Sequence, residues 1–243
     1  MVRVERPSAE IVLVTIDRPE RRNAVDIATL DGLSAAFGEV ALPGTRVVVL
    51  TGAPPAFCAG ADLGGAESEV FQTSLAGALR TIAGCPVPVV AAIDGPALGA
   101  GSQLLSVCDL RVATERSTFG IPAARLGLAV DQWTVDRLVR EFGWGITRAM
   151  LVGAEVFDTH RMVSAGAVHR VGDLDAALAW AETLAAQAPL TVVAHKAALD
   201  AVADPAGSAV DVESLRLAAW ASADASEGRQ AFLEKRPPRF TAS

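Results

Sequence analysis

The stretch Val47–Leu63, VVVLTGAPPAFCAGADL, decides the fold of this chain of 243 residues. Its apolar run is typical of a buried strand, which breaks at Thr51-Gly52 and crosses a loop marked by two prolines. The chain then re-enters at Ala59-Gly60-Ala61-Asp62. Because glycine has no Cβ, such a re-entry point lets a ligand approach the backbone N–H groups closely.

A second stretch, Val89–Leu104, VVAAIDGPALGAGSQL, repeats this plan. It predicts a buried strand, a turn at Asp94-Gly95-Pro96 and a helix that opens at Gly99-Ala100-Gly101. Two N–H groups directed at one oxygen form an oxyanion hole. The backbone at these two glycine-rich points is therefore the candidate ligand site.

Other segments follow the same order of strand, turn and helix, at a period of about 40 residues. We expect a strand at Ile11–Asp17 before a helix capped by Asp26, a fourth unit at Asp109–Pro122, and a weaker strand at Ala167–Val171. An amphipathic helix is predicted by apolar residues at helical spacing: Val70, Phe71, Leu75, Leu79 and Ile82.

The composition changes after Pro189, where the chain reads as helices only, from Leu190 to about Lys235. We therefore divide it into a core, residues 1–189, and a helical region, residues 190–243. Trp220 and Phe232 in this helical region indicate that it packs on its own core or on another subunit.

The net charge, the apolar runs and the spacing of cysteines and histidines exclude several classes of function. A net charge of −7 and a pI near 5.0 argue against general nucleic-acid binding. No uninterrupted apolar run reaches the roughly 18 residues that a membrane span needs, and the N-terminus lacks the apolar core of a signal peptide, so we expect a cytoplasmic protein without a membrane segment. The three cysteines and three histidines lack the spacing of a metal site, and we expect buried free thiols and no catalytic histidine.

Taken together, the motifs resemble the crotonase (enoyl-CoA hydratase/isomerase) superfamily over nearly the whole chain. Six motifs occur in the order of that family: RPERRNAV (18–25), AFCAGADL (56–63), GPALGAGSQL (95–104), CDLRVAT (108–114), FGIPAARLGL (119–128) and AFLEKRPPRF (231–240).

This resemblance implies an α/β fold, a spiral core of ββα turns with a C-terminal helical trimerisation region. It implies a homotrimer or a dimer of trimers, a coenzyme A thioester as ligand, and no separate cofactor or metal. It also implies that the N–H groups of Ala61 and Ala100 form the oxyanion hole.

The same resemblance implies contacts with the ligand at other positions. Arg22 and Lys235 could each meet a phosphate of the nucleotide, although a solvated arginine and a lysine at a helix end are the alternatives. The position that is a lysine in some hydratases is Gly64 here. The remaining candidate contacts are Ala24, Ala59, Asp62, Leu63, Leu98, Gly99 and Phe232.

Two departures from the family concern proton transfer. Family hydratases carry two glutamates at the positions that are Gln103 and Ala123 in this sequence. Glutamine cannot act as a base at neutral pH, and alanine has no polar group. Each positioned acid–base group typically contributes a factor of about 10² to 10⁴ in rate. We therefore expect a poor hydratase that keeps its oxyanion hole, the carbonyl clamp formed by the N–H groups of Ala61 and Ala100.

A third departure lies at Leu128–Trp133, where hydratases carry a small, glycine-rich turn. Asp131 is either a relocated acid, base or nucleophile, with Gln103 orienting a water, or the N-cap of a helix. Trp133 is either a wall of the acyl pocket or an ordinary core aromatic. Arg125 faces the site or the solvent.

Within the family, Gln103, the Asp-x-Trp turn and the tail at 234–238 are most similar to a mycobacterial homologue. That homologue is regarded as a non-hydratase that binds fatty acyl-CoA and serves mycolic acid synthesis, which implies contact with a type II fatty acid synthase. Our leading hypothesis is a binder of fatty acyl-CoA in lipid metabolism. The alternatives are an isomerase, thioesterase or decarboxylase that uses Asp131, and an ordinary enoyl-CoA hydratase.

Overall fold

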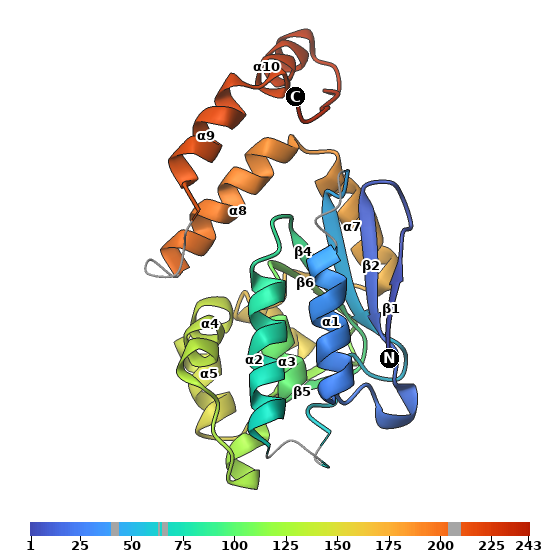
Figure 1. The fold of residues 1–243 in the computed structure, drawn as a ribbon, viewed down its shortest axis with the longest axis vertical. Helices are drawn as coiled ribbons and strands as arrows, with labels where there is room; N and C mark the ends of the chain where they lie inside the picture. Colours follow the sequence, from blue (N-terminus) through green and yellow to red (C-terminus); the bar gives the residue numbers. More distant parts are fainter. Residues whose placement is uncertain (40–43, 63, 65–67, 204–209) are drawn as a thin grey trace.

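The structure is a computed structural model, which describes residues 1–39, 44–62, 64, 68–203 and 210–243 (Figure 1). Its centre is a six-stranded sheet with the order β1-β2-β3-β4-β6-β9. β1 is antiparallel to β2, and the other neighbours are parallel. The strands are β1 (Val2–Glu5), β2 (Ile11–Ile16), β3 (Val47–Gly52), β4 (Val89–Ile93), β6 (Leu110–Ala113) and β9 (Arg170–Val171).

A second sheet of three strands, ordered β5-β7-β8, lies where the chain leaves the large sheet. β5 and β7 are parallel, and β8 is antiparallel to β7. The strands are β5 (Pro96–Leu98), β7 (Thr118–Gly120) and β8 (Val156–Asp158). The two 3-10 turns are η1 (Pro19–Arg21) and η2 (Pro122–Leu126).

Both faces of the large sheet are covered, which explains why its strands read as continuous apolar runs. On one face, alternate residues such as Val48 and Leu50 join α1, α2 and α3 in the large core cluster. On the other face, their neighbours Val47 and Val49 pack on α7. The covering helices are α1 (Ile27–Glu39), α2 (Glu69–Ala83), α3 (Ala100–Leu105) and α7 (Leu174–Ala185).

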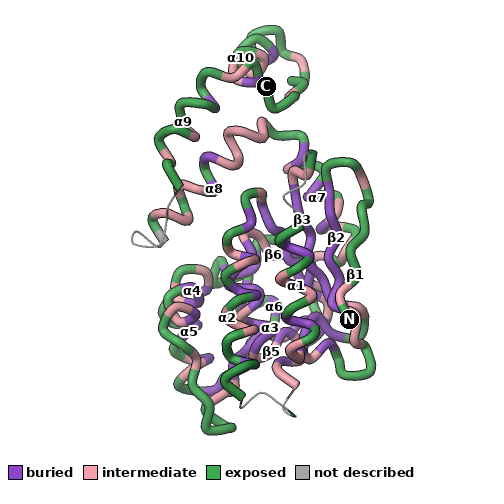
Figure 2. Tube along the Cα trace, in the orientation of Figure 1, coloured by how far each residue is buried: buried purple, intermediate pink, exposed green. Residues whose placement is uncertain are grey.

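The remaining helices flank this core. α4 (Gln132–Phe142), α5 (Trp144–Leu151) and α6 (Thr159–Ser164) follow the second sheet, and α8 (Pro189–Ala203), α9 (Val212–Ala221) and α10 (Ala223–Glu234) end the chain. Figure 1 shows α9 and α10 standing away from the sheet, and Figure 2 shows them largely exposed. α8 begins at the predicted change of composition; the division into two regions stays a prediction.

Several predicted elements are confirmed. Asp26 caps α1, because its Oδ1 accepts hydrogen bonds from Thr29 N (2.8 Å) and Thr29 Oγ1 (2.6 Å). The amphipathic helix is α2, in which Phe71, Leu79 and Ile82 are buried. Val70 was wrongly placed on the buried face, and it is 61% exposed in the first turn of α2.

Two predicted boundaries differ from the structure. The predicted strand at Ala167–Val171 is only Arg170–Val171, because Ala167 and Val168 are instead buried in the core before the strand begins. The predicted unit at Asp109–Pro122 divides into β6 and β7, which lie in different sheets. Among the described residues, no helix is both long and apolar enough to cross a membrane.

Candidate functional site

The two glycine-rich turns lie against each other. Outside the named strands, Cys58 pairs with Ala97 in a parallel bridge, and Leu98 N donates to Cys58 O at 2.9 Å. A Cβ on Gly99 would lie 3.5 Å from Gly60 Cα, and both glycines have positive φ values, +54° and +122°. These conformations favour glycine, which lets the two turns approach closely.

Ala61 and Ala100 directly follow these two glycines. Val25 N donates to Gly60 O (2.9 Å) and Asp62 N donates to Val25 O (2.8 Å), so this bridge does not use the N–H of Ala61. Neither that N–H nor the N–H of Ala100, the first residue of α3, has an acceptor among the described residues. Because backbone N–H groups inside proteins are almost always paired, two free ones on adjoining turns are suited to a ligand oxygen.

Ser102 holds the start of α3 in place, a role that the sequence analysis missed. Its hydroxyl donates to Ala97 O (2.6 Å) and accepts from Gly120 N (3.0 Å). Gly120 O in turn accepts from Gly99 N at 2.8 Å. This buried serine therefore links α3 to β5 and β7. The available signal was a polar residue within a run of small residues.

Gln103 and Ala123 flank the same region. Gln103 lies on α3, is partly buried, and its side-chain amide has no hydrogen-bond partner among the described residues. Ala123 lies in η2 and packs against the large core cluster. Nearby, the Cys58 thiol is protonated at neutral pH, because burial raises its pKa to about 12.

Asp131 is the N-cap of α4. Its two carboxylate oxygens accept from Thr134 N (3.2 Å) and Thr134 Oγ1 (2.7 Å), and its side chain is exposed. Trp133 packs partly buried on the core cluster, with the Arg80 guanidinium 5.2 Å from its ring centroid. The N-cap interpretation of Asp131 is confirmed, and its catalytic alternative stays a prediction.

The turn after η1 brings further candidate residues together. Ala59 N donates to Arg22 O at 3.0 Å. Arg18 donates to Ala24 O and lies 3.3 Å from a carboxylate oxygen of Asp62. The exposed Arg22 side chain makes no hydrogen bond or ion pair with another described residue, which suits a solvated arginine and a phosphate ligand equally.

Asn23 builds this turn and was also missed from the sequence. It is fully buried at a φ of +57°, and its Nδ2 donates to Ala53 O and Ala56 O, both at 2.6 Å. Its Oδ1 accepts from Arg18 N at 2.8 Å. Asparagine tolerates this left-handed conformation better than most residues.

Other candidates do not join the site. Phe232 and Lys235 are exposed on or just after α10, which Figure 1 shows at the far end of the molecule from β5 and α3. Arg125 donates to Ala154 O at 2.7 Å. Leu63 lies outside the described residues.

The histidines and cysteines form no metal cluster within the described ranges. His169 Nδ1 accepts from Arg111 N at 3.1 Å. Burial and the charge of Arg111 together lower the pKa of His169 to about 4, so this ring is neutral at pH 7. All three cysteines are buried and free.

Comparison with known proteins gives the family. The model of the enoyl-CoA hydratase/isomerase family matches residues 6–243. The chain belongs to this family. Among its relatives is the "Probable enoyl-CoA hydratase echA6" of Mycobacterium tuberculosis, which is 40% identical over 236 residues, 96% of each chain. The 2,3-dehydroadipyl-CoA hydratase of Escherichia coli is 34% identical, over 95% of this chain and 94% of that protein.

Solved structures of the enoyl-CoA hydratase/isomerase family agree with the fold. An enoyl-CoA hydratase/carnithine racemase from Magnetospirillum magneticum superimposes with a TM-score of 0.90 at 31% identity, covering 100% of this chain and 96% of that one. An enoyl-CoA hydratase from Bacillus anthracis gives 0.86 at 28% identity, over 100% and 99% of the two chains. The predicted crotonase-type α/β fold is confirmed.

Proposed function

We propose that this protein binds fatty acyl-CoA thioesters through hydrogen bonds from the N–H groups of Ala61 and Ala100 to the thioester oxygen, and that it hydrates enoyl-CoA poorly. One observation carries the proposal. Two free N–H groups follow abutting glycines, while Gln103 and Ala123 occupy the positions of the hydratase glutamates.

The residues around the clamp suit the parts of an acyl-CoA. The exposed Arg22, beside Ala59 and Ala24, supplies a cation and backbone groups for the nucleotide end. Leu98 and Trp133 offer apolar surface for the acyl chain. The resemblance places Phe232 and Lys235 at the nucleotide. Because α10 stands away from β5 and α3 in Figure 1, we propose that a neighbouring copy supplies these two residues.

The site lacks strong groups for proton transfer at the two family positions. The Gln103 amide can donate and accept a hydrogen bond, so it can orient a water or the ligand, but it cannot take up a proton at neutral pH. Ala123 offers only a methyl group. Carbonyl polarisation without a base leaves the ligand bound and unreacted.

The alternative chemistry through Asp131 has less support. Both of its oxygens are engaged by Thr134 at the start of α4. Ordinary hydration, which the names of several relatives state for those proteins, would need another acid–base group beside the thioester. A role in fatty acid synthesis beside a type II synthase stays a prediction from the resemblance alone.

Binding of a matched pair of ligands tests the clamp. Octanoyl-CoA carries the carbonyl oxygen, and S-octyl-CoA, a thioether, lacks it. Two hydrogen bonds at about 0.5–1.5 kcal/mol each predict that the wild-type protein binds the thioester about 5- to 150-fold more tightly in calorimetry.

A backbone variant provides the control. Ala100→Pro removes the N–H at the first helical position, where proline is tolerated, and should bring the thioester affinity down toward that of the thioether; its unchanged affinity for the thioether checks that the added ring does not distort the site. Ala100→Gly keeps the N–H and should keep the preference. Equal binding of both ligands by the wild-type protein would refute the proposed clamp.

A further inference from the structure

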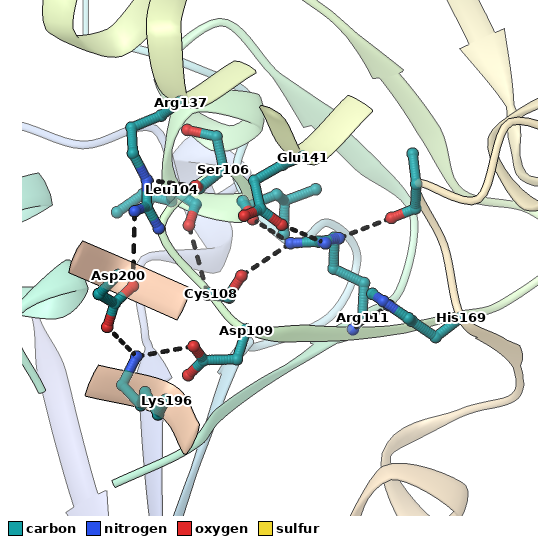
Figure 3. A network of polar contacts seen from close by, with 12 residues as sticks. Leu104, Ser106, Cys108, Asp109, Arg111, Arg137, Glu141, His169, Lys196 and Asp200 are labelled. Carbon is teal, nitrogen blue, oxygen red and sulfur yellow. Dashed lines mark hydrogen bonds and ion pairs between the residues drawn. The ribbon is translucent and has the colours of Figure 1, made fainter. Parts of the chain in front are cut away.

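Two buried arginines hold the far end of α3, the helix that begins at Ala100 (Figure 3). Arg111 Nη1 donates to Leu105 O (2.9 Å) and to Cys108 O (2.7 Å), and Arg137 Nε donates to Ser106 O (3.2 Å). The last carbonyls of a helix have no partner within it, and cations are favoured there. The carboxyl end of α3 is therefore fixed by two guanidinium groups.

Both arginines connect this end of α3 to α4. Arg137 lies on α4, and Arg111 Nη2 bonds Glu141 Oε2 at 2.6 Å one turn further along the same helix. Arg111 Nε also donates to Ala167 O at 2.6 Å. Arg111 is 2% exposed, so its position is set by these contacts.

A row of charges extends the network to α8. Asp200 Oδ1 lies 3.7 Å from Arg137 Nη1, and Asp200 Oδ2 lies 3.3 Å from Lys196 Nζ. Lys196 Nζ is 2.6 Å from Asp109 Oδ1. Asp109 Oδ2 accepts from Val89 N (2.7 Å), at the start of β4, the strand that leads through β5 to α3. Through Asp109 and Arg137, the charges of α8 are thus linked to the start of β4 and to the residue that follows α3.

We propose that Arg137, paired with Asp200 of α8, is a positioning residue for the carbonyl clamp: it fixes α3 so that the Ala100 N–H points at the thioester oxygen. This inference rests on the proposed function. α3 has six residues and is about 9 Å long, so a shift at its carboxyl end moves its amino end. An oxyanion donor acts only within about 2.7–3.1 Å, so a small displacement weakens it.

The test compares Arg137→Gln, Arg137→Lys and Asp200→Asn with the matched control Arg140→Gln, an exposed arginine on the same helix. The readout is the ratio of S-octyl-CoA to octanoyl-CoA dissociation constants. We expect this ratio to fall at least threefold in Arg137→Gln and Asp200→Asn, with the thioether affinity within twofold of wild type. Arg137→Lys, which keeps the charge, should restore part of the preference, and the control should not change it.

Hydrogen exchange of the unliganded protein gives a readout that does not depend on ligand binding. We expect the hydrogen-bonded amides at 103–106 to exchange faster in both charge-removing variants, while those of α1 do not change. Asp200 is 36% exposed in its side chain, so Asp200→Asn carries the test if Arg137→Gln fails to fold.

The outcomes separate the two proposals. If folded Asp200→Asn keeps both the wild-type ratio and the wild-type exchange, the positioning role is wrong and the clamp stands. A parallel loss of affinity for both ligands would also overturn it, because that indicates a general structural defect. If the wild-type protein shows no thioester preference, the proposed function fails and the positioning role fails with it.

Discussion

Individual glycines set the geometry of the clamp. Gly101 follows Ala100, and a Cβ there would lie 2.3 Å from Cys58 O, a backbone atom that cannot move aside freely. Gly52 is similarly crowded by Phe57 O at 2.1 Å. The two turns therefore keep their separation only if these positions lack a side chain.

The first prediction follows from this crowding. Gly101→Ala should lower the free energy of unfolding by about 1–3 kcal/mol, since it overpacks a buried contact, and should reduce the preference for octanoyl-CoA over S-octyl-CoA. Chemical denaturation and calorimetry measure the two effects.

The matched control is Gly77→Ala. Gly77 lies inside α2, and an added Cβ would meet nothing within 4 Å. Because alanine favours a helix over glycine by about 1 kcal/mol, this variant should be more stable than wild type. A Gly101→Ala protein as stable as Gly77→Ala would contradict the close contact between the two turns.

At the scale of elements, α4 connects the candidate acyl wall to the far end of α3. Its N-cap Asp131 precedes Trp133, and Arg137 lies on the same helix. Less than two turns of α4 thus contain the N-cap Asp131, the proposed pocket wall Trp133 and the proposed positioning residue Arg137.

The second prediction separates the two interpretations of Asp131. Asp131→Ala should cost about 1 kcal/mol of stability through the lost cap, and Asp131→Asn should cost little, because asparagine caps equally well. Neither change should alter reaction rates on a panel of acyl-CoA thioesters. A turnover present in wild type and absent in a stable Asp131→Asn protein would make Asp131 the chemical group.

The elements that sequence alone predicted well are those with strong local patterns. The run at Ile11–Ile16 and the capped helix after Asp26 need no distant information, because periodicity and capping chemistry are local. Val70 was misplaced because it fits the helical spacing of the apolar residues as well as the buried Phe71 does. Only the orientation of α2 on the core decides which side of the helix is buried.

The candidate site was predictable where glycine spacing marks the backbone, at Gly60 and Gly99. The polar residues that hold these two turns in place could not be predicted from the sequence. The hydroxyl of Ser102 and the guanidinium groups of Arg111 and Arg137 act on carbonyls in other segments, and no local pattern indicates those partners.

For the whole molecule, the end of the chain carries apolar surface that its own core does not cover. The most exposed large side chains of α9 and α10 are Leu217 (54%), Trp220 (66%), Phe232 (83%) and Leu233 (79%). Several large apolar side chains exposed on neighbouring helices are typical of an interaction site. We propose that these helices join copies of the chain, as the resemblance implies.

The third prediction concerns that assembly. Light scattering should give a mass of about 75 kDa, three times 25.1 kDa, or twice that for a dimer of trimers. The double variant Trp220→Asp/Leu233→Asp should dissociate, since charges in an apolar contact are costly. Leu126→Asp, at a residue 57% exposed outside these helices, is the control. A wild-type monomer at micromolar concentration would exclude this role for α9 and α10.

The rate of hydration of 2-octenoyl-CoA tests the central claim most directly. With both proton-transfer groups missing, the wild-type protein should turn over at least about 10⁴-fold more slowly than the roughly 10 to 10³ per second of ordinary enzymes. The variant Gln103→Glu/Ala123→Glu should hydrate at least about tenfold faster than wild type. A wild-type rate within the ordinary range would contradict the account.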